Sequence, residues 1–349
     1  MKQNEKFTSE TDLVAILLIG CLSMFFAEVV VGSSLIWIID PWSLIVTFPL
    51  YLAHLLFFLN LAMRTKRTSI PHLYLWGVLF GLYEAWITKV LWWGYPGSGG
   101  PILGLVGGIA IIEFLVLVFF WHPLQAFVFP ILIYEIFVLS ENKKLTIEQK
   151  VFPSHLEYIK KDSKFFLIFI FTILIASVFL SASSGPNLLI ADIALISSLG
   201  LIILLLFLIK KRKPRKFSVY SLKLGNKGFL LVIFYLIGLY IFTYFTFGPE
   251  LIPGIIPHLI IISFYVLIGI IEYMSNPIEE IEFKDSLIIE NIIVSKDIFK
   301  LLAILLIGTS IFCFVPFIIH NILYLIFTFM ISGIGIILLI LFLKKSLTS

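Results

Sequence analysis

The sequence predicts an all-α protein, a polytopic transmembrane helical bundle. Of its 349 residues, 60% are hydrophobic and only 13% are charged, whereas a soluble domain is usually about half apolar and about a quarter charged. Its apolar runs reach about 20 residues, the length that crosses a hydrocarbon core. A water-soluble globular fold is therefore excluded, and we expect the lipid bilayer as the surrounding partner.

The apolar segments follow one another with short connections. The first begins at Leu13 and is too long for the apolar region of a cleavable signal peptide, so it is interpreted as a retained membrane anchor. The candidate segments are residues 13–39, 42–63, 72–93, 102–121, 123–140, 165–184, 188–209, 229–247, 251–274, 299–319 and 322–343.

Positive charges mark one side of the predicted membrane. Lys and Arg gather in loops that would share that side, while the opposite loops contain neither residue. This asymmetry predicts a cell-membrane protein with both termini in the cytoplasm. It also explains the net charge of +4 without a nucleic-acid partner. The positively charged stretches are residues 64–71, 141–164, 210–227, 275–300 and 344–345.

The loop charges also constrain how often the chain crosses. If residues 64–71 and 141–164 lie on one side, an even number of crossings must separate them, yet three apolar segments lie between them. The third, residues 123–140, is the shortest and contains Pro123 and Pro130, and proline breaks or kinks a helix. We therefore expect about ten crossings, with 123–140 broken, re-entrant or interfacial. If 123–140 instead crosses, loop 141–164 lies outside.

The whole chain, residues 1–349, is expected to form a single integral membrane domain. Its longest polar stretches are only about 25 residues, too short for a separate domain. Buried ionisable residues concentrate in 72–140, the candidate functional core, while 165–343 is interpreted as mainly apolar helical scaffold. Both cysteines, Cys21 and Cys313, lie in apolar segments, so a disulfide framework is not indicated.

Four ionisable residues fall at one predicted depth. Counted from the nearest predicted helix end, each lies roughly 15–18 Å below the outer surface, close to the membrane midplane. An ionisable group there is costly unless it is paired, protonated or facing water. The candidate midplane site consists of Glu28, His54, Glu84 and Glu113.

Such a layer has three interpretations. Carboxylates that lie close together cannot all ionise, so one of them can carry a proton at neutral pH, as in the Asp/Glu/His relays of transporters. With His54 added, the set also resembles a ligand group for a divalent metal, although no specific motif supports a cofactor. The third interpretation is structural: the side chains only pair neighbouring helices, and His54 is a hydrogen-bonded core histidine.

A second group lies nearer the predicted inner surface. It consists of His122, Gln125 and Glu135, which would line an inner cavity if 123–140 re-enters; otherwise His122 and Pro123 form an ordinary helix-end anchor. Lys89, close to Trp92 and Trp93, is expected to extend its amine to the outer interface.

The function classes that remain are all membrane classes. The leading hypothesis is a carrier whose midplane Glu/His layer binds a proton or cation, coupled to transport of a small solute. The alternatives are an intramembrane enzyme, either a metallohydrolase or a transferase acting on a lipid-linked substrate, and a structural or assembly subunit. The sequence identifies neither a substrate nor a catalytic residue.

Overall fold

The described residues form helices and the turns between them. The computed structural model describes residues 12–93, 105–142, 145–212, 217–277 and 291–348. These residues include no β-strand, only two isolated bridges. The prediction of an all-helical polytopic bundle is confirmed.

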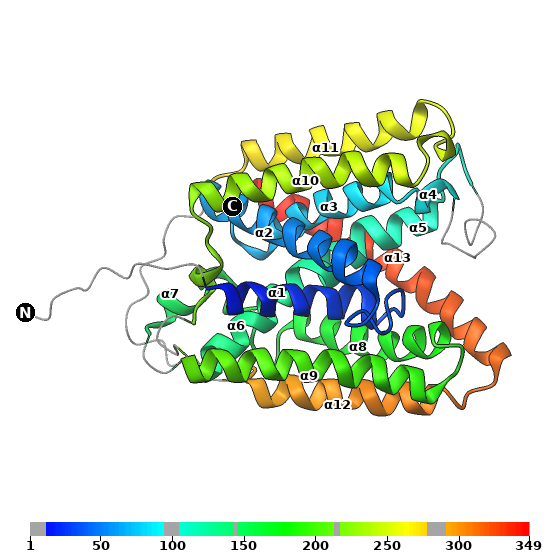
Figure 1. Ribbon diagram of the computed structural model, residues 1–349. Coiled ribbons are helices and arrows are strands. Elements are labelled where there is room, and N and C mark those ends of the chain that lie inside the picture. Colours follow the sequence, from blue (N-terminus) through cyan, green and yellow to red (C-terminus); the bar gives the residue numbers. More distant parts are fainter. Residues whose placement is uncertain (1–11, 94–104, 143–144, 213–216, 278–290, 349) are drawn as a thin grey trace, which may run out of the picture.

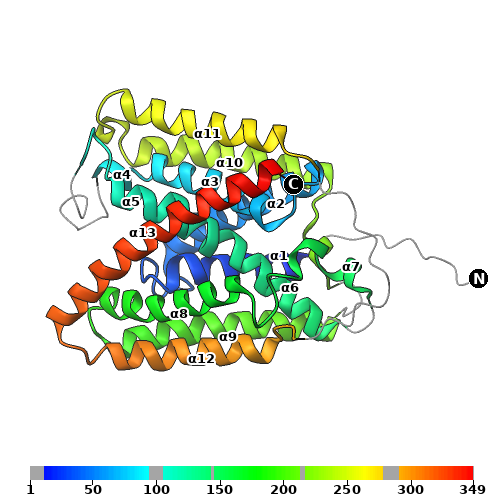
Figure 2. The ribbon, with the colours of Figure 1, turned by 180° about the vertical axis from the view of Figure 1, so that it is seen from behind.

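Seven helices in the described residues are long and apolar enough to cross a membrane. Three shorter helical stretches of the described residues run between the same two ends of the molecule as these spans (Figures 1 and 2). The long passes are η2 (Ser43–Thr47) with α2 (Phe48–Thr65), α5 (Ile111–Val116) with η3 (Leu117–Val128) and α6 (Phe129–Glu141), α8 (Lys164–Ser183), α9 (Leu188–Arg212), α10 (Asn226–Thr246), α11 (Ile256–Met274) and α13 (Phe317–Thr348). The shorter passes are α1 (Leu13–Met24) with η1 (Phe25–Val29), α3 (Ile70–Ile87) and α12 (Ser295–Phe312).

The helices surround one buried pass. Helices α10 and α11 form one flank of the bundle and α8, α9 and α12 the other, while α13 crosses diagonally over the face seen in Figure 2. The α5–η3–α6 pass runs between these flanks: 94% of its central stretch is buried, against 17% for α10. The core of the bundle is therefore built around residues 111–141.

Both described ends of the chain lie at one end of the bundle (Figure 1). Helix α1 begins there, with Asp12 accepting the amide of Val14 at 2.8 Å as an N-cap, and α13 ends there. We call this the terminus end and the other the opposite end. A common side for the termini agrees with an even number of passes, while its assignment to the cytoplasm stays a prediction.

The first pass is shorter than its apolar run. Helix is expected over residues 13–39, but it ends at Val29, and the chain continues in turns to Ile39. Its last turns are π-helical, and the carbonyl of Glu28 accepts the amides of Gly32 and Ser33, each at 3.0 Å. Gly32 has φ = +80°, and a Cβ there would lie 2.3 Å from Cβ of Ser183. A glycine thus ends this helix against α8.

The prediction that 123–140 is a separate broken or re-entrant segment is wrong. Residues 111–141 form one continuous helical pass of 31 residues, and the expected helix over 102–121 begins only at Ile111. Two expected segments are thus one pass, which resolves the parity conflict without a re-entrant element. Pro123 lies inside the π-helical stretch η3, whose wider turns accommodate a residue that an α-helix excludes.

Hydroxyl groups from other helices bond backbone carbonyls close to the two prolines. A proline inside a helix deprives the carbonyl four residues earlier of its donor. Pro123 lies in η3, where an amide bonds the carbonyl five residues earlier, so the carbonyl that it frees is that of Val118. The adjacent carbonyl of Phe119 accepts the hydroxyl of Tyr74 at 2.5 Å. For Pro130 the freed carbonyl is that of Ala126, which accepts the hydroxyl of Ser23 at 2.6 Å. These bonds let a proline-containing helix remain continuous in an apolar environment.

Two glycines allow α3 to pack directly on η3. A Cβ at Gly77 would lie 2.7 Å from Cα of Pro123, and a Cβ at Gly81 would lie 3.2 Å from Cβ of His122. Small residues permit this close approach of helix backbones in membranes. The contact brings His122 into the centre of the bundle, beside α3.

Candidate functional site

Glu28 lies in the π-helical end of the first pass and is held by two hydroxyl groups. Glu28 is buried, with 8% of its surface exposed. Ser34 donates to Oε2 at 2.8 Å, and Oη of Tyr51 lies 2.5 Å from Oε1. Ser34 is half-buried and its neighbour Ser33 is exposed. The carboxylate therefore sits just beneath the turns that follow η1 at the opposite end.

Tyr51 connects Glu28 to His122. Its hydroxyl lies 3.5 Å from Nε2 of His122, and the two rings are stacked with centroids 6.3 Å apart and planes 6° apart. Both residues are buried, at 1% exposure each. Three helical passes thus contribute one carboxylate, one phenol and one imidazole to a buried polar chain, which we call the Glu28–Tyr51–His122 chain.

The backbone of η3 determines the tautomer of His122. Nδ1 of the ring lies 2.9 Å from the carbonyl of Leu117. A carbonyl only accepts, so Nδ1 carries the hydrogen, and Nε2 of the neutral ring is an acceptor facing Tyr51. Next to His122, the indole of Trp121 donates to the carbonyl of Ala27 at 2.9 Å, which ties η3 to η1 beside Glu28.

Each of the three passes that contribute to the chain contains a π-helical stretch. Glu28 is in η1, His122 is in η3, and Tyr51 follows η2 by one turn. π-Helical turns are rare overall, but those that occur are often found at functional sites, where they widen a helix and redirect its side chains. Their occurrence in each pass that contributes to the chain marks this region as the candidate site.

His54 lies one turn beyond Tyr51 on α2 and is fully hydrogen-bonded. Its Nδ1 donates to the carbonyl of Leu50 at 2.8 Å, and its Nε2 is 3.0 Å from the hydroxyl of Tyr240. Its ring is stacked on Phe80, with centroids 4.6 Å apart, and Phe80 also meets the ring of His122 edge-on at 5.5 Å. His54 therefore borders the chain through Phe80 and connects α2 to α10.

The remaining midplane candidates are placed differently. The side chain of Glu84 lies outside the described part of the structure, while its backbone belongs to α3. Glu113 is buried at 4% exposure, but it falls in the first turn of α5 rather than halfway along a helix. Because the pass begins at Ile111, the residue roughly 15 Å along it is His122. The expected depths of Glu113 and His122 are therefore corrected.

Glu135 and Gln125 do not line one cavity together with His122. Glu135 accepts the amide of Phe152 at 2.9 Å and lies 2.7 Å from Nδ1 of His155, whose Nε2 donates to the carbonyl of Thr68 at 2.6 Å. Both members of this pair are fully buried. Glu135 therefore anchors the loop after α6 to the α2–α3 turn.

Gln125 is placed closer to the chain. It follows His122 by three residues in η3 and is completely buried. Among the described residues, neither its amide nitrogen nor its amide oxygen has a hydrogen-bond partner. It is the member of the expected inner group that remains beside the candidate site.

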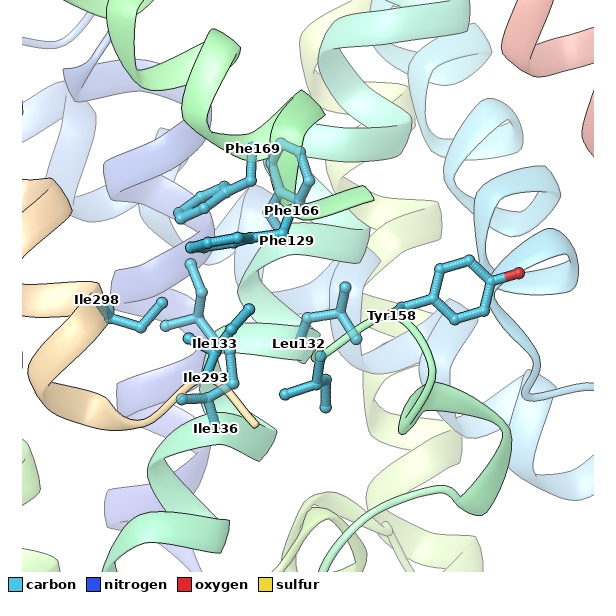
Figure 3. Close-up of a pocket in the computed structure, with 10 residues that line it drawn as sticks. Phe129, Leu132, Ile133, Ile136, Tyr158, Phe166, Phe169, Ile293 and Ile298 are labelled. Carbon is cyan, nitrogen blue, oxygen red and sulfur yellow. The ribbon is translucent and has the colours of Figure 1, made fainter. Parts of the chain in front are cut away.

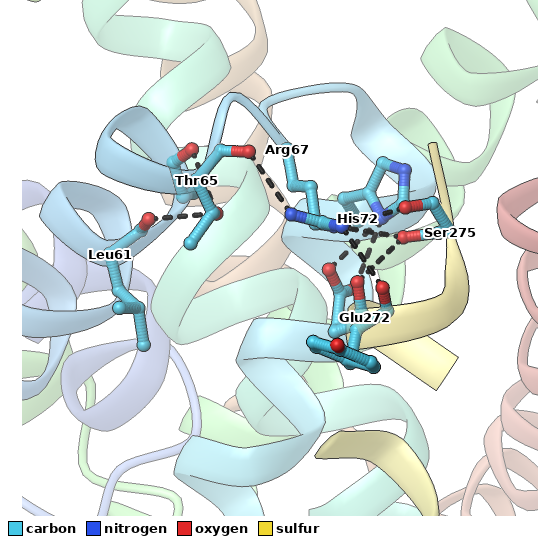
Figure 4. Close-up of polar contacts among 8 residues, drawn as sticks. Leu61, Thr65, Arg67, His72, Glu272 and Ser275 are labelled. Atoms are coloured by element: carbon cyan, nitrogen blue, oxygen red, sulfur yellow. Dashed lines mark hydrogen bonds and ion pairs between the residues drawn. The ribbon is translucent and has the colours of Figure 1, made fainter. Parts of the chain in front are cut away.

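A second buried pair, which the sequence analysis did not identify, lies at the terminus end (Figure 4). Nδ1 of His72, at the start of α3, is 3.1 Å from Oε2 of Glu272, near the end of α11. Arg67 donates to the hydroxyl of Ser275 at 3.0 Å and to its carbonyl at 2.7 Å. Both His72 and Glu272 lie about one turn from the terminus end of their helices. This shared level is the sequence feature that could have identified the pair.

Lys89 does not extend to the interface as expected. Its residue is 1% exposed, and its amine donates to the carbonyl of Tyr244 at 2.7 Å and lies 4.5 Å from that ring. Helix α3 ends at Ile87, and Lys89 has φ = +61°, so the chain turns and directs the side chain toward α10. The amine is held between α3 and α10.

An apolar cavity lies apart from the polar chain (Figure 3). It measures about 20 Å³ and lies between α6, the loop before α8, and the start of α12. Its lining includes Phe129, Ile133 and Phe169. Its volume is sufficient for one water molecule, but an apolar lining supplies no hydrogen-bond partners, so such a cavity stays dry.

A metal centre is not apparent in the described residues: no three His, Cys, Asp or Glu side chains among them are grouped closely enough to hold an ion. The Glu28–Tyr51–His122 chain supplies one carboxylate, one phenol and one imidazole. What this set offers by its own chemistry is a series of groups that accept and donate protons.

The fold and site define a class of protein, a polytopic helical membrane protein with a buried glutamate–tyrosine–histidine chain in its core. The chain belongs to an uncharacterized membrane protein family, whose model matches residues 17–348. It is similar to an uncharacterized protein of Archaeoglobus fulgidus, with 34% identity over 252 residues, covering 72% of this chain and 74% of that relative. No solved structure matches the chain.

Proposed function

We propose that this protein is a proton-coupled carrier of the cell membrane, and that the transported proton binds to the Glu28–Tyr51–His122 chain. The observation that carries the proposal is a series of two contacts: Oε1 of Glu28 lies 2.5 Å from the hydroxyl of Tyr51, and this hydroxyl lies 3.5 Å from Nε2 of His122. Buried Glu and His side chains in membrane helices are characteristic of proton pathways.

The chain can hold one proton in two places. With Glu28 protonated, its O–H donates to Tyr51, whose hydroxyl donates to the acceptor Nε2 of neutral His122. When the proton moves to His122, Nε2–H donates to Tyr51 and the hydroxyl of Tyr51 donates to the Glu28 carboxylate. The two arrangements contain the same atoms and the same total charge, because one hydrogen shifts along each bond.

Transfer along the chain requires a small movement of helices. The Tyr51–His122 separation of 3.5 Å exceeds the usual O–H···N distance, so the two groups must approach by about 0.5 Å or more. They lie on different passes, next to π-helical stretches that offer alternative backbone hydrogen bonding. The proposal therefore couples proton transfer to repacking of η3 against α2.

Access from the opposite end is supported by the turns after η1. Ser33 is exposed, and Ser34 donates directly to the carboxylate of Glu28. Irregular backbone at this depth occurs where it is packed in protein or lines a water-filled space. Combined with the positive-inside prediction, this would place proton entry on the outer side of the membrane.

Reconstituted vesicles containing a pH-sensitive dye provide the test. Ions and small solutes would be added in turn, and the lumenal pH would be followed with a membrane potential imposed. We expect at least one solute to drive proton movement through the wild-type protein. Glu28→Gln and His122→Asn should each reduce that flux about tenfold or more, equivalent to about 1.4 kcal/mol in the barrier.

Glu141→Gln serves as a control variant because Glu141 forms only a partly exposed ion pair with Lys210 at the end of α6. It should transport as the wild type does. Wild-type proton flux in both Glu28→Gln and His122→Asn would rule out the proposed role of the chain.

A further inference from the structure

We propose that Gln125, His72 and Glu272 form the second half of the proton path, joined by bound water molecules between the Glu28–Tyr51–His122 chain and the terminus end. This inference rests on the proposed function and extends it. It assigns a route of exit to groups that the chain itself does not use.

Gln125 is the first group of this route. It is fully buried in η3, three residues from His122 toward the terminus end, and its amide lacks a partner in the described part of the chain. Burying an amide without a hydrogen bond costs several kcal/mol. Buried polar groups of this kind are normally satisfied by ordered water.

Helix α3 carries two further groups of the same kind. Trp76 Nε1 and His72 Nε2 are both buried without a partner among the described residues. They are four residues apart, so they lie on the same face of α3. This face therefore presents two buried polar atoms that can each form a hydrogen bond with a bound water molecule.

The close packing of α3 on η3 fixes the relative levels of these groups. Gly77 lies directly against Pro123, which places Trp76 near the level of Gln125. His72 lies four residues before Trp76 in α3, about 6 Å nearer the terminus end. Hydrogen-bonded waters are spaced about 2.8 Å apart, so two of them span this distance.

The His72–Glu272 pair then leads to the surface. Glu272 is 3% exposed and is followed by Tyr273 and Met274, which are exposed. Arg67 is the charged group that faces the pair from the α2–α3 turn, and it binds Ser275 at the end of α11 (Figure 4). A proton on Glu272 is thus within about one turn of the terminus end, where Arg67 binds the next turn of the chain at Ser275.

The test measures protonation of Glu28 from each side of the membrane. Vesicles holding the full chain in one orientation would receive a pH jump on one side, and the infrared band of the protonated Glu28 carboxyl, identified by its loss in Glu28→Gln, would be followed in time. We expect Gln125→Leu and Glu272→Gln to slow protonation from the terminus side about tenfold or more, and to leave the rate from the opposite side unchanged.

Thr309→Val is the matched control. Thr309 also has a buried hydroxyl without a partner among the described residues, but it lies on α12 in the outer flank; its removal should change neither rate. Unchanged rates from the terminus side in both Gln125→Leu and Glu272→Gln, or equal slowing in Thr309→Val, would overturn the second half of the path alone. Absence of any titrating Glu28 band in the wild type would instead refute the proposed function, and this inference with it.

Discussion

The hydroxyl oxygen of Tyr51 lies 2.5 Å from Oε1 of Glu28, within the range of a charge-assisted O–H···O⁻ bond. The two residues come from the first and second passes, and both are buried. This bond joins the end of η1 and the first turn of α2 into one polar unit. Its removal is therefore the most direct perturbation of the candidate site.

Tyr51→Phe removes the hydroxyl and keeps the ring. We expect the free energy of unfolding to fall by about 1–3 kcal/mol, because a buried carboxylate loses a hydrogen bond. We also expect the infrared band of Glu28 to titrate independently of His122. Thermal unfolding in detergent and infrared titration would measure the two effects.

Tyr265→Phe is a suitable comparison for this variant. The hydroxyl of Tyr265 donates only to a backbone carbonyl, that of Leu79, at 3.1 Å. Its loss should cost about 1 kcal/mol and leave the Glu28 titration as in the wild type. If both tyrosine variants altered that titration equally, Tyr51 would have no special connection to Glu28.

Gly77→Ala tests the contact between α3 and η3. The added Cβ would lie 2.7 Å from Cα of Pro123, and backbone atoms cannot move aside as a flexible side chain does. We expect destabilisation of about 1–3 kcal/mol or more from overpacking. At Gly238 in α10 nothing lies within 4 Å of the added Cβ, so Gly238→Ala should stabilise the protein by up to about 1 kcal/mol. Chemical denaturation compares the two, and an equal effect would refute this packing argument.

Glu135→Ala tests the buried pair at the terminus end. The change leaves His155 and the amide of Phe152 without their acceptor, and breaking a buried pair costs about 3–5 kcal/mol. We expect faster proteolysis of the loop between α6 and α8 as well as lower stability. Glu141→Ala, six residues farther, removes a partly exposed ion pair with Lys210 and should cost under about 1 kcal/mol. Equal losses would show that the buried loop anchor is unimportant.

Asp40 predicts a local pH dependence at the opposite end. Hydrogen bonds from Ser43, including its amide at 2.7 Å, lower the pKa of the Asp40 carboxyl. Because folding lowers this pKa, the stabilisation is present above the unfolded value and is lost as the pH falls through the lowered one. Amide exchange at Ser43, corrected for intrinsic rates, should lose protection over that acidic range. Asp40→Asn keeps an acceptor but does not titrate, so its protection should not vary; identical profiles would contradict this account.

The composition of the sequence and the lengths of its apolar runs predicted most of the fold. Apolar runs of membrane length located every pass, and the even crossing count between residues 64–71 and 141–164 is satisfied. The error at 123–140 had a definite cause. A proline marks a helix interruption only if the surrounding backbone cannot be satisfied in another way. Here Pro123 lies in a π-helical stretch, and the carbonyl that Pro130 frees accepts the hydroxyl of Ser23 from another pass.

The candidate site was only partly accessible by the same reasoning. Glu28 was identified because a carboxylate in an apolar run needs an explanation. His122 was assigned to the wrong level, because the helix that carries it begins at Ile111 and not near Pro101. Tyr51 gave no signal, since a tyrosine in an apolar segment is common and its hydroxyl partner is set by packing.

The sequence by itself determined that this is a polytopic helical membrane protein, since length and hydrophobicity of each segment suffice to place it in a bilayer. Only the tertiary structure decided that Glu28, Tyr51 and His122 meet. Their contact depends on where π-helical turns rotate each pass and on how closely Gly77 and Gly81 let α3 approach η3. Those are properties of helices packed together, and no single segment encodes them.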